Sequence, residues 1–426
     1  MRIPTSRLLA AISAAGLALA TAAPSLAEAA PTGTGDYTVR PVMIKADISA
    51  KKPSALPTPA ECLAELGFAC NTPQTIRDAY DIPATINGKP AGTGRTIAIV
   101  DAFGSPTAQS DLDTFSATMG IPSTTLRIFH PTGAAHYKNT DLINGWASET
   151  SLDVQWAHAI APGATIDLVV ASTPAGDVMN QAIKYATDTL HADAVSMSFG
   201  SPEGWLTGRN GNKIHYKDAA KIIASGTANG TTYIASSGDS DSDNGLGFAN
   251  YAYPASDSNV TSVGGTNLFS NLTKSLPAET VWNDFDGCPF GCAQGQFGGT
   301  GGAPSVITNK GGSDVSYDGS VYTGVLVEMT FNPDPAQHGL YFVGGTSAGS
   351  PQWAAIAADL DQSVGHRLGN LRPSLSSWAA AGALRDVTVG DNKSQTYSAG
   401  FSAKAGWDVP TGWGSPDVGR LLDQVK

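Results

Sequence analysis

The sequence predicts an α/β domain of the doubly wound type, in which a mostly parallel sheet has helices on both faces. Its strand-like runs are apolar along their whole length, which is typical of strands buried on both sides of a parallel sheet. Helix-like segments alternate with these runs. The chain has 426 residues, 41% of them hydrophobic, and its many Gly and Pro residues form no repeat, so a large globular core is expected.

The alternation begins with an apolar strand at residues 95–102. It continues through a helix at 106–120, a strand at 124–131, a helix at 146–161, a strand at 164–172, a helix at 175–190, a strand at 192–200, a helix at 216–230 and a strand at 231–239. We then expect Gly-, Ser- and Asn-rich loops as far as about residue 341, a helix over 347–361 and a last helix after Pro416. In such a sheet, ligands bind at the carboxyl ends of the strands.

The N-terminal segment, residues 1–29, has the features of a secretory signal peptide. Two arginines precede an apolar run, and the segment ends in the small-residue pattern Ala27-Glu28-Ala29. A membrane anchor is the alternative, but the apolar run is shorter than the roughly 20 residues that cross a bilayer. We expect a secreted protein in which residues 30–91 form a short propeptide or N-terminal extension and 92–426 form the main domain.

Export would favour disulfides for the four cysteines. Cys62 is close to Cys70 in sequence, and Cys288 is close to Cys292, so we expect two local disulfides. A metal knuckle at the second pair is the alternative. The formal charge of −12 is unfavourable for binding nucleic acid or an anionic membrane, and we expect neither as a partner.

Ser347 lies between a glycine-rich turn and a segment that is predicted to be a buried helix. Such a position can expose a nucleophile, but a serine hydroxyl needs a base to activate it. The chain has seven histidines, and none is followed by the Gly-Thr pair that marks the catalytic histidine of subtilisins. The base must therefore be another group.

Two carboxylates, Glu149 and Asp153, are four residues apart on a predicted helix and so share one face of it. An apolar stripe that includes Leu152 and Trp156 would press this helix against the sheet. A half-buried pair of acids at this spacing tends to share a proton, which raises one apparent pKa and suits acid–base chemistry at acidic pH. A solvated helix face with two ordinary carboxylates is the alternative.

A third acid, Asp239, ends a predicted strand and is followed by Asp241 and Asp243. Beside a nucleophile, Asp239 would have to be protonated when an oxyanion forms, and it could then donate a hydrogen bond worth on the order of 3 kcal/mol. A Ca²⁺ loop of the EF-hand type is the alternative, but the flanking helices and the final glutamate of such a loop are missing from the sequence.

In these motifs the sequence resembles the sedolisins, which are secreted serine-carboxyl peptidases. The resemblance rests on three motifs in the family's order: ETSLD at 149–153, SGDS at 237–240 and GTSAGSP at 345–351. It extends from about Pro73 to the C-terminus. It implies a subtilisin-like fold in which glutamate takes the place of histidine.

The resemblance also implies the catalytic roles. Ser347 would be the nucleophile, Glu149 its general base and acid, and Asp153 the residue that orients Glu149. Asp239 would complete an oxyanion hole with the backbone N–H of Ser347. Asp101, at the end of the first strand, would either extend the acid network or serve as an ordinary strand-end cap.

Two binding sites follow from the resemblance as well. Ser198, Phe199 and Gly200, at a strand end, would pair with an extended peptide substrate. Near the C-terminus, two segments resemble the halves of the family's calcium site. They imply one structural Ca²⁺ ion held by oxygens of Asp386, Val387, Lys404, Gly406 and Asp408.

We therefore expect a secreted, monomeric endopeptidase that hydrolyses protein or peptide substrates at acidic pH through an acyl-enzyme intermediate. A tripeptidyl-peptidase of the same family and a non-catalytic binding protein on the same fold are the alternatives. The segment before the first catalytic strand is much shorter than the folded propeptide that is usual in sedolisin precursors. The preferred side chain at the cleavage site is not predicted by the sequence.

Overall fold

The computed structural model describes residues 36–39, 41–48, 56–134, 136–207, 213–269, 272, 278–284, 297–394 and 399–426. The described residues all belong to one compact unit, Pro31–Lys426, and residues 1–30 lie outside the described residues. The predicted signal peptide and the cysteine pair Cys288 and Cys292 lie outside them too, so both stay predictions. Among the residues described, no helix combines the length and the apolar character that crossing a membrane requires.

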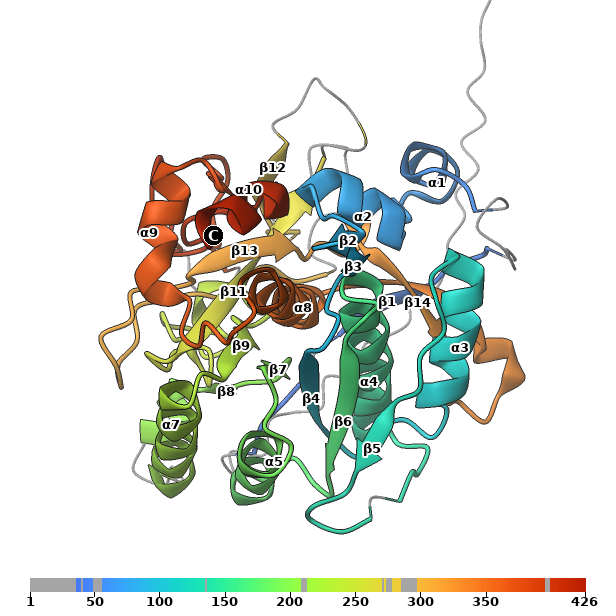
Figure 1. The fold of residues 1–426 in the computed structure, drawn as a ribbon, viewed down its shortest axis with the longest axis horizontal. Coiled ribbons are helices and arrows are strands. Elements are labelled where there is room, and N and C mark those ends of the chain that lie inside the picture. The colour runs from blue at the N-terminus through green and yellow to red at the C-terminus, as the bar shows by residue number, and fades with distance from the viewer. Residues whose placement is uncertain are drawn as a thin grey trace, which may run out of the picture. The chain divides into compact units, whose positions relative to one another are not determined.

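The predicted mostly parallel sheet is present in the Pro31–Lys426 unit (Figure 1). Within the described residues it has eight strands. They follow the order β12 (Glu279–Val281), β11 (Val260–Leu268), β9 (Thr232–Ser236), β7 (Ala194–Met197), β4 (Thr96–Ala102), β6 (Thr165–Ala171) and β5 (Arg127–Phe129), with β13 (Val315–Asp318) also paired to β11. All of these pairs are parallel except β11 with β12. The fold class is therefore confirmed.

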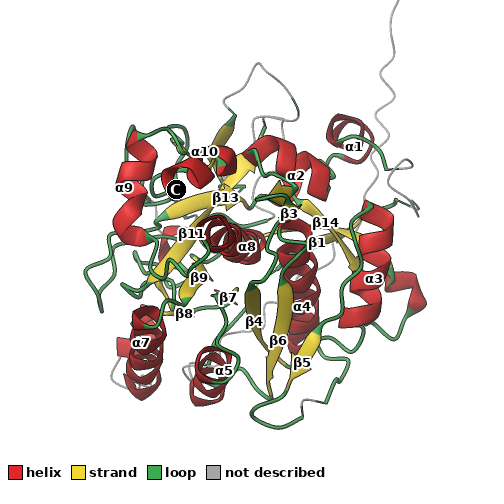
Figure 2. Ribbon diagram, viewed as in Figure 1, coloured by secondary structure: helices red, strands yellow, loops and turns green. Residues whose placement is uncertain are grey.

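Helices cover both faces of this sheet, again as predicted (Figure 2). One face carries α3 (Ala108–Met119), α4 (Asp141–Ile160) and α8 (Thr346–Val364), and the other carries α5 (Gly176–Asp188) and α7 (Lys213–Ala228). Successive side chains of a strand point to opposite faces. In β4, Ile97 and Ile99 accordingly pack in the core under α4 and α8, whereas Ala98 and Val100 pack in the core under α5 and α7.

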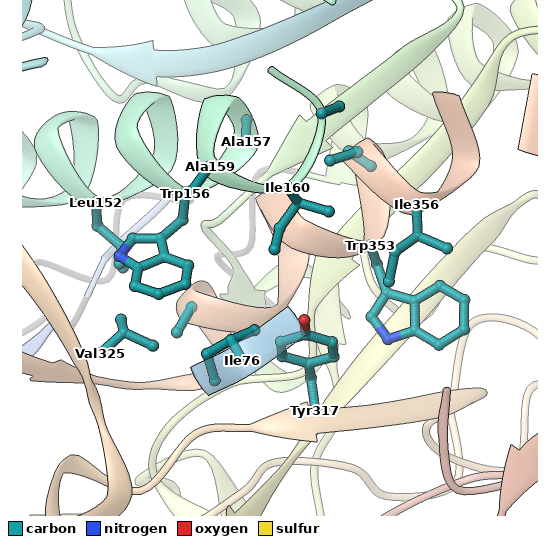
Figure 3. Close-up of a cluster of buried hydrophobic side chains, with 14 of the residues drawn as sticks. Ile76, Leu152, Trp156, Ala157, Ala159, Ile160, Tyr317, Val325, Trp353 and Ile356 are labelled. Carbon is teal, nitrogen blue, oxygen red and sulfur yellow. The ribbon is translucent and has the colours of Figure 1, made fainter. Parts of the chain in front are cut away.

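Helix α4 is buried almost from end to end, which the sequence pattern did not indicate. Figure 3 shows Leu152, Trp156 and Ile160 of this helix in one buried cluster with Trp353 of α8, and Ile160 lies on the side toward Trp353. The indole N–H of Trp156 donates a hydrogen bond to the carbonyl oxygen of Leu326 at 3.0 Å, so even the polar atom of this side chain has a partner. The helix that carries the two predicted acids is therefore an internal element of the molecule.

The region predicted as loops, residues 240–341, is the part where the prediction was wrong. It contains β11, β13, β14 (Val325–Met329) and the start of β15 (Gly339–Gly344). The glycines of β11 made this segment resemble a loop in the sequence. In the structure, a Cβ at Gly265 would lie only 2.6 Å from the Trp282 ring. Glycine stands there because another side chain comes too close for any larger residue.

The predicted extension, residues 30–91, also holds regular structure. Strand β1 (Val42–Lys45) pairs antiparallel with β15, and β15 pairs with β14, which makes a second, three-stranded sheet. Two helices follow, α1 (Pro59–Leu66) and α2 (Pro73–Tyr80). Arg77 of α2 donates hydrogen bonds to the carbonyl oxygens of Ala159 and Ile160 at the end of α4. This segment thus packs in the same compact unit as residues 92–426.

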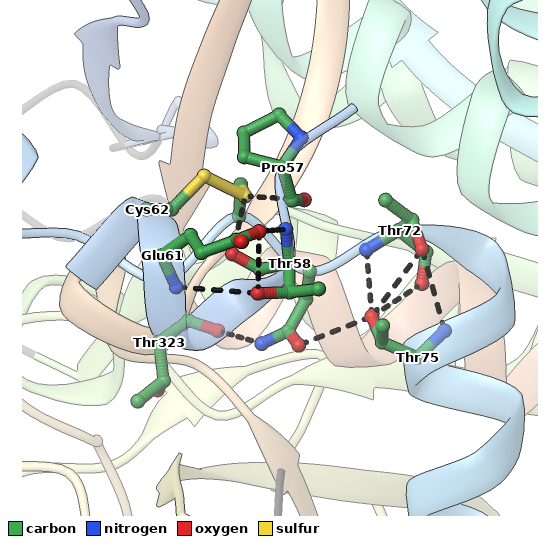
Figure 4. Close-up of a disulfide and its surroundings, with 9 residues drawn as sticks. Pro57, Thr58, Glu61, Cys62, Thr72, Thr75 and Thr323 are labelled. Carbon is green, nitrogen blue, oxygen red and sulfur yellow. Dashed lines mark hydrogen bonds between the residues drawn. A yellow bond between two sulfur atoms is a disulfide. The ribbon is translucent and has the colours of Figure 1, made fainter. Parts of the chain in front are cut away.

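The predicted disulfide between Cys62 and Cys70 is present, with the two sulfur atoms 1.96 Å apart (Figure 4). It closes a short loop after α1, whose first turn is fixed by a capping box between Thr58 and Glu61. The predictions at the C-terminal end hold for α8 and for α10 (Val418–Gln424), while α9 (Arg372–Ala380) was not foreseen. The remaining elements are short: β2 (Thr85–Ile86), β3 (Lys89–Pro90), β8 (Ser201–Pro202), α6 (Glu203–Thr207), β10 (Ala252–Tyr253), β16 (Leu384–Arg385) and β17 (Ser415–Pro416).

Candidate active site

Ser347 is the second residue of α8, which begins directly after β15. The turn between them requires glycine at position 345, because Gly345 has φ of +118° and a Cβ there would lie 2.9 Å from Oδ2 of Asp239. Farther along the helix, Pro351 lacks the N–H that would bond the Ser347 carbonyl one turn earlier. That carbonyl instead lies 3.4 Å from Oγ of Ser198.

Three carboxyl groups are fully buried in the same region: Asp101 at the end of β4, and Glu149 and Asp153 on α4. Helix α4 packs against both α8 and β4, which brings these acids to the side of α8. The alternative of a solvated helix face carrying two ordinary carboxylates is therefore wrong. Asp101 is fully buried as well, and because its charge acts on both Glu149 and Asp153 it belongs to the acid cluster rather than being an ordinary strand-end cap.

Ser198 connects the acid cluster to Ser347. Its hydroxyl donates a hydrogen bond to Oδ1 of Asp153 at 2.9 Å, and its carbonyl oxygen accepts one from Oγ of Ser347 at 3.4 Å. The nearby Ser347 hydroxyl interacts favourably with the charged form of Glu149 and so lowers the pKa of that carboxyl. Within the described residues, neither oxygen of Glu149 has a hydrogen bond of good geometry, so this carboxyl is available to a reacting group.

Burial and mutual repulsion keep protons on this cluster. Burial raises the pKa of Glu149 well above its ordinary value, and the nearby charge of Asp101 raises it further. The pKa of Asp153 is raised by the same causes, burial first and then Asp101 and Glu149. Burial raises the pKa of Asp101 to about 7, against a smaller opposing effect of the Thr150 hydroxyl. At acidic pH the cluster therefore holds shared protons rather than three charges.

Asp239 follows β9 and is fixed to the first turn of α8. Its Oδ1 accepts hydrogen bonds from the N–H and from Oγ of Thr346, both at 2.7 Å. The N–H of Gly238 donates to the same threonine hydroxyl at 3.1 Å. Asp239 therefore lies at the N-terminal end of α8 next to Ser347, where the resemblance places the oxyanion donor, and its charge contributes to the raised pKa of Glu149.

A surface groove opens at Ser347. Its described lining includes Ser347, Asp239 and the three predicted substrate-binding residues, together with Thr38, Val39, Pro202, Trp205, Ser236, Gly238, Ser240, Asn244 and Ala252. No histidine is among these described lining residues. His158, although it is on α4, has its Nε2 2.6 Å from the carbonyl oxygen of Pro122, and burial lowers its pKa.

The structure thus brings together all four predicted catalytic residues and Ser198, Phe199 and Gly200. Sequence reasoning missed the side-chain role of Ser198, which was expected to offer only its backbone to a substrate. The available signal was a serine directly after a buried strand and before a phenylalanine, because a buried hydroxyl needs a partner.

The predicted calcium ligands also lie together. Oδ2 of Asp386 accepts the N–H of Gly406 at 2.8 Å, and Oδ2 of Asp408 accepts the N–H of Lys404 at 3.0 Å. Burial raises the pKa of Asp408, and the charge of Asp386 adds to this rise. Val387, the residue after Asp386, is buried.

Two carboxylates with backbone oxygens are a donor set that suits a hard cation. In this structure, however, the two carboxylates bind N–H groups of the 404–408 loop, and no cluster of three or more His, Cys, Asp or Glu side chains in the described part of the chain could hold a metal. The calcium ion therefore stays a prediction, in which it would replace these N–H groups as the partner of the carboxylates.

Comparison with known proteins agrees with this fold and site. The model of the subtilase family matches residues 130–407, and the chain belongs to that family of subtilisin-like proteins. A solved structure of Pseudomonas sedolisin, a serine-carboxyl proteinase complexed with two molecules of pseudo-iodotyrostatin, aligns with a TM-score of 0.70 and 26% identity over 84% of this chain and 98% of that chain. Among subtilisin-like proteins, the chain is a member of the sedolisin family, as its motifs predicted.

Two relatives illustrate the range of the family. Kumamolisin from Bacillus sp. (strain MN-32) is 30% identical over 372 residues, which cover 83% of this chain and 63% of that protein. Tripeptidyl-peptidase 1 from Mus musculus is 25% identical over 383 residues, which cover 82% of this chain and 64% of that protein. The chain thus spans less than two thirds of the length of either relative.

Proposed function

We propose that this protein is a serine-carboxyl endopeptidase that hydrolyses peptide bonds of proteins at acidic pH. One observation carries the proposal: Ser347 lines a groove, and three fully buried acids lie next to it. The described residues that line the groove include no histidine. A cluster of shifted pKa values next to a nucleophile is typical of a catalytic centre.

In the first step, the carboxylate form of Glu149 accepts the proton of the Ser347 hydroxyl as Oγ bonds to the substrate carbonyl carbon. Glu149 then gives this proton to the nitrogen of the breaking C–N bond, and the amine leaves an acyl-enzyme. A water molecule attacks the acyl carbon by the same proton route and releases the acid product. Asp153, held by Ser198, shares a proton with Glu149 and keeps it oriented between the two transfers.

Asp239 supplies the oxyanion donor in this proposal. Its Oδ1 accepts two hydrogen bonds from Thr346, which hold the carboxyl beside Ser347, and in the proposal the protonated carboxyl donates a hydrogen bond to the oxyanion of the tetrahedral intermediate. This donor exists only in the protonated form, which is one reason for activity at acidic pH. Removing an oxyanion donor of this kind lowers kcat by about two powers of ten or more.

The decisive experiment is the digestion of an unfolded protein by purified enzyme between pH 3 and pH 8, with mass spectrometry of the products. We expect activity at the acidic end that declines toward neutral pH, and its loss in Ser347→Ala and Glu149→Gln. Ser363→Ala, at the other end of α8, is the matched control and should be fully active. Full activity at pH 8 with none at pH 4 would contradict the proposal.

The products also distinguish the alternatives. Similarity to tripeptidyl-peptidase 1 favours release of tripeptides as the second candidate activity, and internal cuts without a tripeptide ladder would exclude it. A non-catalytic binding protein would show no digestion by the wild-type chain at any pH. Its folding and ligand binding would then be unaffected by Ser347→Ala.

The proposal includes secretion and a calcium ion. Export is supported by the signal-like residues 1–29 and is tested by recovery of the protein from the medium with a shortened N-terminus. A bound Ca²⁺ would tie Asp386 to the 404–408 loop and would stabilise the fold rather than take part in the reaction. We propose a monomer, which light scattering of the purified protein would verify.

A further inference from the structure

Asp284 is a fully buried acid that no step of the proposed mechanism uses. It follows β12, and burial raises its pKa to about 7. Its Oδ2 accepts a hydrogen bond from the indole N–H of Trp282 at 2.8 Å, and the hydroxyl of Ser320 donates to its two oxygens at 3.1 Å. An acid with a raised pKa costs stability once it ionises, so we looked for its role in these two contacts.

One side of Asp284 leads to Asp239 through the backbone of Gly299. This glycine forms a bridge with Asn283, the residue before Asp284, and a second bridge with Ser240, the residue after Asp239. The N–H of Gly299 donates to the carbonyl oxygen of Asp239 at 3.4 Å, and the N–H of Asp284 donates to the carbonyl oxygen of the residue before Gly299 at 2.9 Å. The backbone of the proposed oxyanion donor is therefore held by a segment that the Asp284 backbone holds in turn.

The other side of Asp284 leads to the turn before Ser347. Ser320, whose hydroxyl binds the Asp284 carboxyl, follows Gly319 in the chain. The carbonyl oxygen of Gly319 accepts a hydrogen bond from the N–H of Gly345 at 2.6 Å. Because Gly345 begins the turn that presents Ser347, the contact between Asp284 and Ser320 helps to fix the place of the nucleophile.

The ring of Trp282 fills the space between these two sides. The residue is fully buried. A Cβ at Gly298 would lie 3.5 Å from the ring, and a Cβ at Gly319 would lie 3.3 Å from it, so the ring packs close to both segments. An indole has a single N–H donor, and its hydrogen bond to Asp284 therefore fixes the orientation of the ring.

We propose that Asp284 is a positioning residue for the oxyanion site, because its carboxyl ties the segment that holds Asp239 to the turn that holds Ser347. The inference rests on the proposed peptidase function. Asp284 is not among the described residues that line the groove, so it acts through Trp282 and Ser320. An oxyanion needs its donors at about 2.7–3.1 Å, so a small shift of either segment weakens the tetrahedral intermediate more than the binding of an unreacted peptide.

Asp284→Ala is compared with Asp361→Ala as the matched control. Asp361 lies near the other end of α8 from Ser347, is also fully buried, and has a pKa that burial raises to about 7. We expect Asp284→Ala to lower kcat on a labelled peptide at acidic pH by about tenfold or more with little change in KM, because a displacement of about 1 Å near the reacting groups costs up to about a hundredfold. Asp361→Ala should keep the wild-type kcat, even where its melting temperature falls by as much.

A peptide aldehyde and the corresponding peptide alcohol separate positioning from general damage. The Ser347 oxygen adds to the aldehyde carbon and the hydroxyl proton passes to the aldehyde oxygen, which gives a tetrahedral adduct, whereas the alcohol binds without reacting. Asp284→Ala should weaken aldehyde binding by about the same factor as kcat and leave the affinity for the alcohol unchanged. In an Asp239→Asn background the effect of Asp284→Ala should be much smaller, because residues that act on one site are not additive.

Ser320→Ala tests the same link if Asp284→Ala does not fold. It removes the hydroxyl that joins Asp284 to the turn but leaves the bond to Trp282, and kcat should fall about fivefold, as for the loss of one ordinary hydrogen bond. Asp284→Asn keeps an acceptor oxygen for the indole, and the Ser320 hydroxyl can rotate to accept the amide N–H. The kcat of Asp284→Asn should therefore lie much closer to the wild-type value than that of Asp284→Ala.

Wild-type kcat and aldehyde affinity in folded Asp284→Ala and Ser320→Ala would overturn the inference while leaving the peptidase function intact. Equal weakening of aldehyde and alcohol binding would overturn it as well, since a general loss of structure has that effect. No hydrolysis and no aldehyde adduct with the wild-type chain at any pH tested would instead refute the proposed function.

Discussion

The pH dependence of stability offers a direct test of the buried acid cluster, through the substitution Asp101→Asn. Asparagine has nearly the shape of a protonated aspartate but cannot ionise. Both carboxylate oxygens of Asp101 are buried and, in the described part of the structure, lack a hydrogen bond of good geometry, so the exchange should disturb few contacts. Ser347→Ala is used as the background so that self-digestion does not interfere.

The sign of the effect follows from the pKa of Asp101. Burial raises the pKa in the folded state to about 7, whereas the unfolded value is near 3.8. The folded state therefore binds more protons than the unfolded state between these values, and stability is lost as the pH rises through this window. A pKa shift of about 3 units lowers the free energy of unfolding by about 4 kcal/mol above pH 7, because each unit corresponds to about 1.36 kcal/mol. Asp101→Asn should remove this penalty.

Urea unfolding at pH 3.5, 5.5 and 8 measures the effect. We expect the variant and its parent to be within about 1 kcal/mol at pH 3.5, and the variant to be more stable by about 2 to 4 kcal/mol at pH 8. Asp113→Asn, an exposed aspartate on α3, is the control and should show no pH-dependent difference. A stability difference for Asp101→Asn that is the same at all three pH values would refute the reasoning.

Three further predictions concern the neighbouring groups. Ser198→Ala removes the 2.9 Å hydrogen bond to Asp153, so kcat should fall about fivefold with little change in KM, because an ordinary buried hydrogen bond is worth about 1 kcal/mol. An unchanged kcat would contradict this role. Gly345→Ala forces a Cβ to 2.9 Å from Oδ2 of Asp239 at a φ of +118°. The substitution should therefore lower both the melting temperature and the activity. A variant with wild-type values of both would argue against the turn geometry. Removal of the proposed Ca²⁺ by a chelator should lower the melting temperature of the wild-type protein but not that of Asp386→Asn, and calorimetry measures both. An equal response of the two proteins would contradict calcium binding at Asp386.

The acid cluster shows how far the sequence could lead. The spacing of Glu149 and Asp153 placed them on one face of a helix, and the strand before Asp239 placed that acid at the carboxyl end of a buried strand. The motif order then connected both to Ser347. What the sequence left open was whether α4 lies at the surface or inside, because its apolar stripe would fit either position.

The failures of prediction have a common physical cause. Gly265 and its neighbours obscured β11, since glycine is used there to let the Trp282 ring approach, and such a contact is invisible in a one-dimensional pattern. The same is true of β1, whose short polar surroundings resemble a linker until its partner β15 is seen.

The sequence by itself determined the parallel α/β fold, through apolar strands that alternate with helices, and it singled out the candidate reacting groups, through motifs local to the chain. Tertiary structure alone decided that Asp101, Glu149 and Asp153 are fully buried together and that Ser198 joins them to Ser347. These features depend on contacts between residues far apart along the chain, and pKa shifts arise from the burial and charges that only such contacts create.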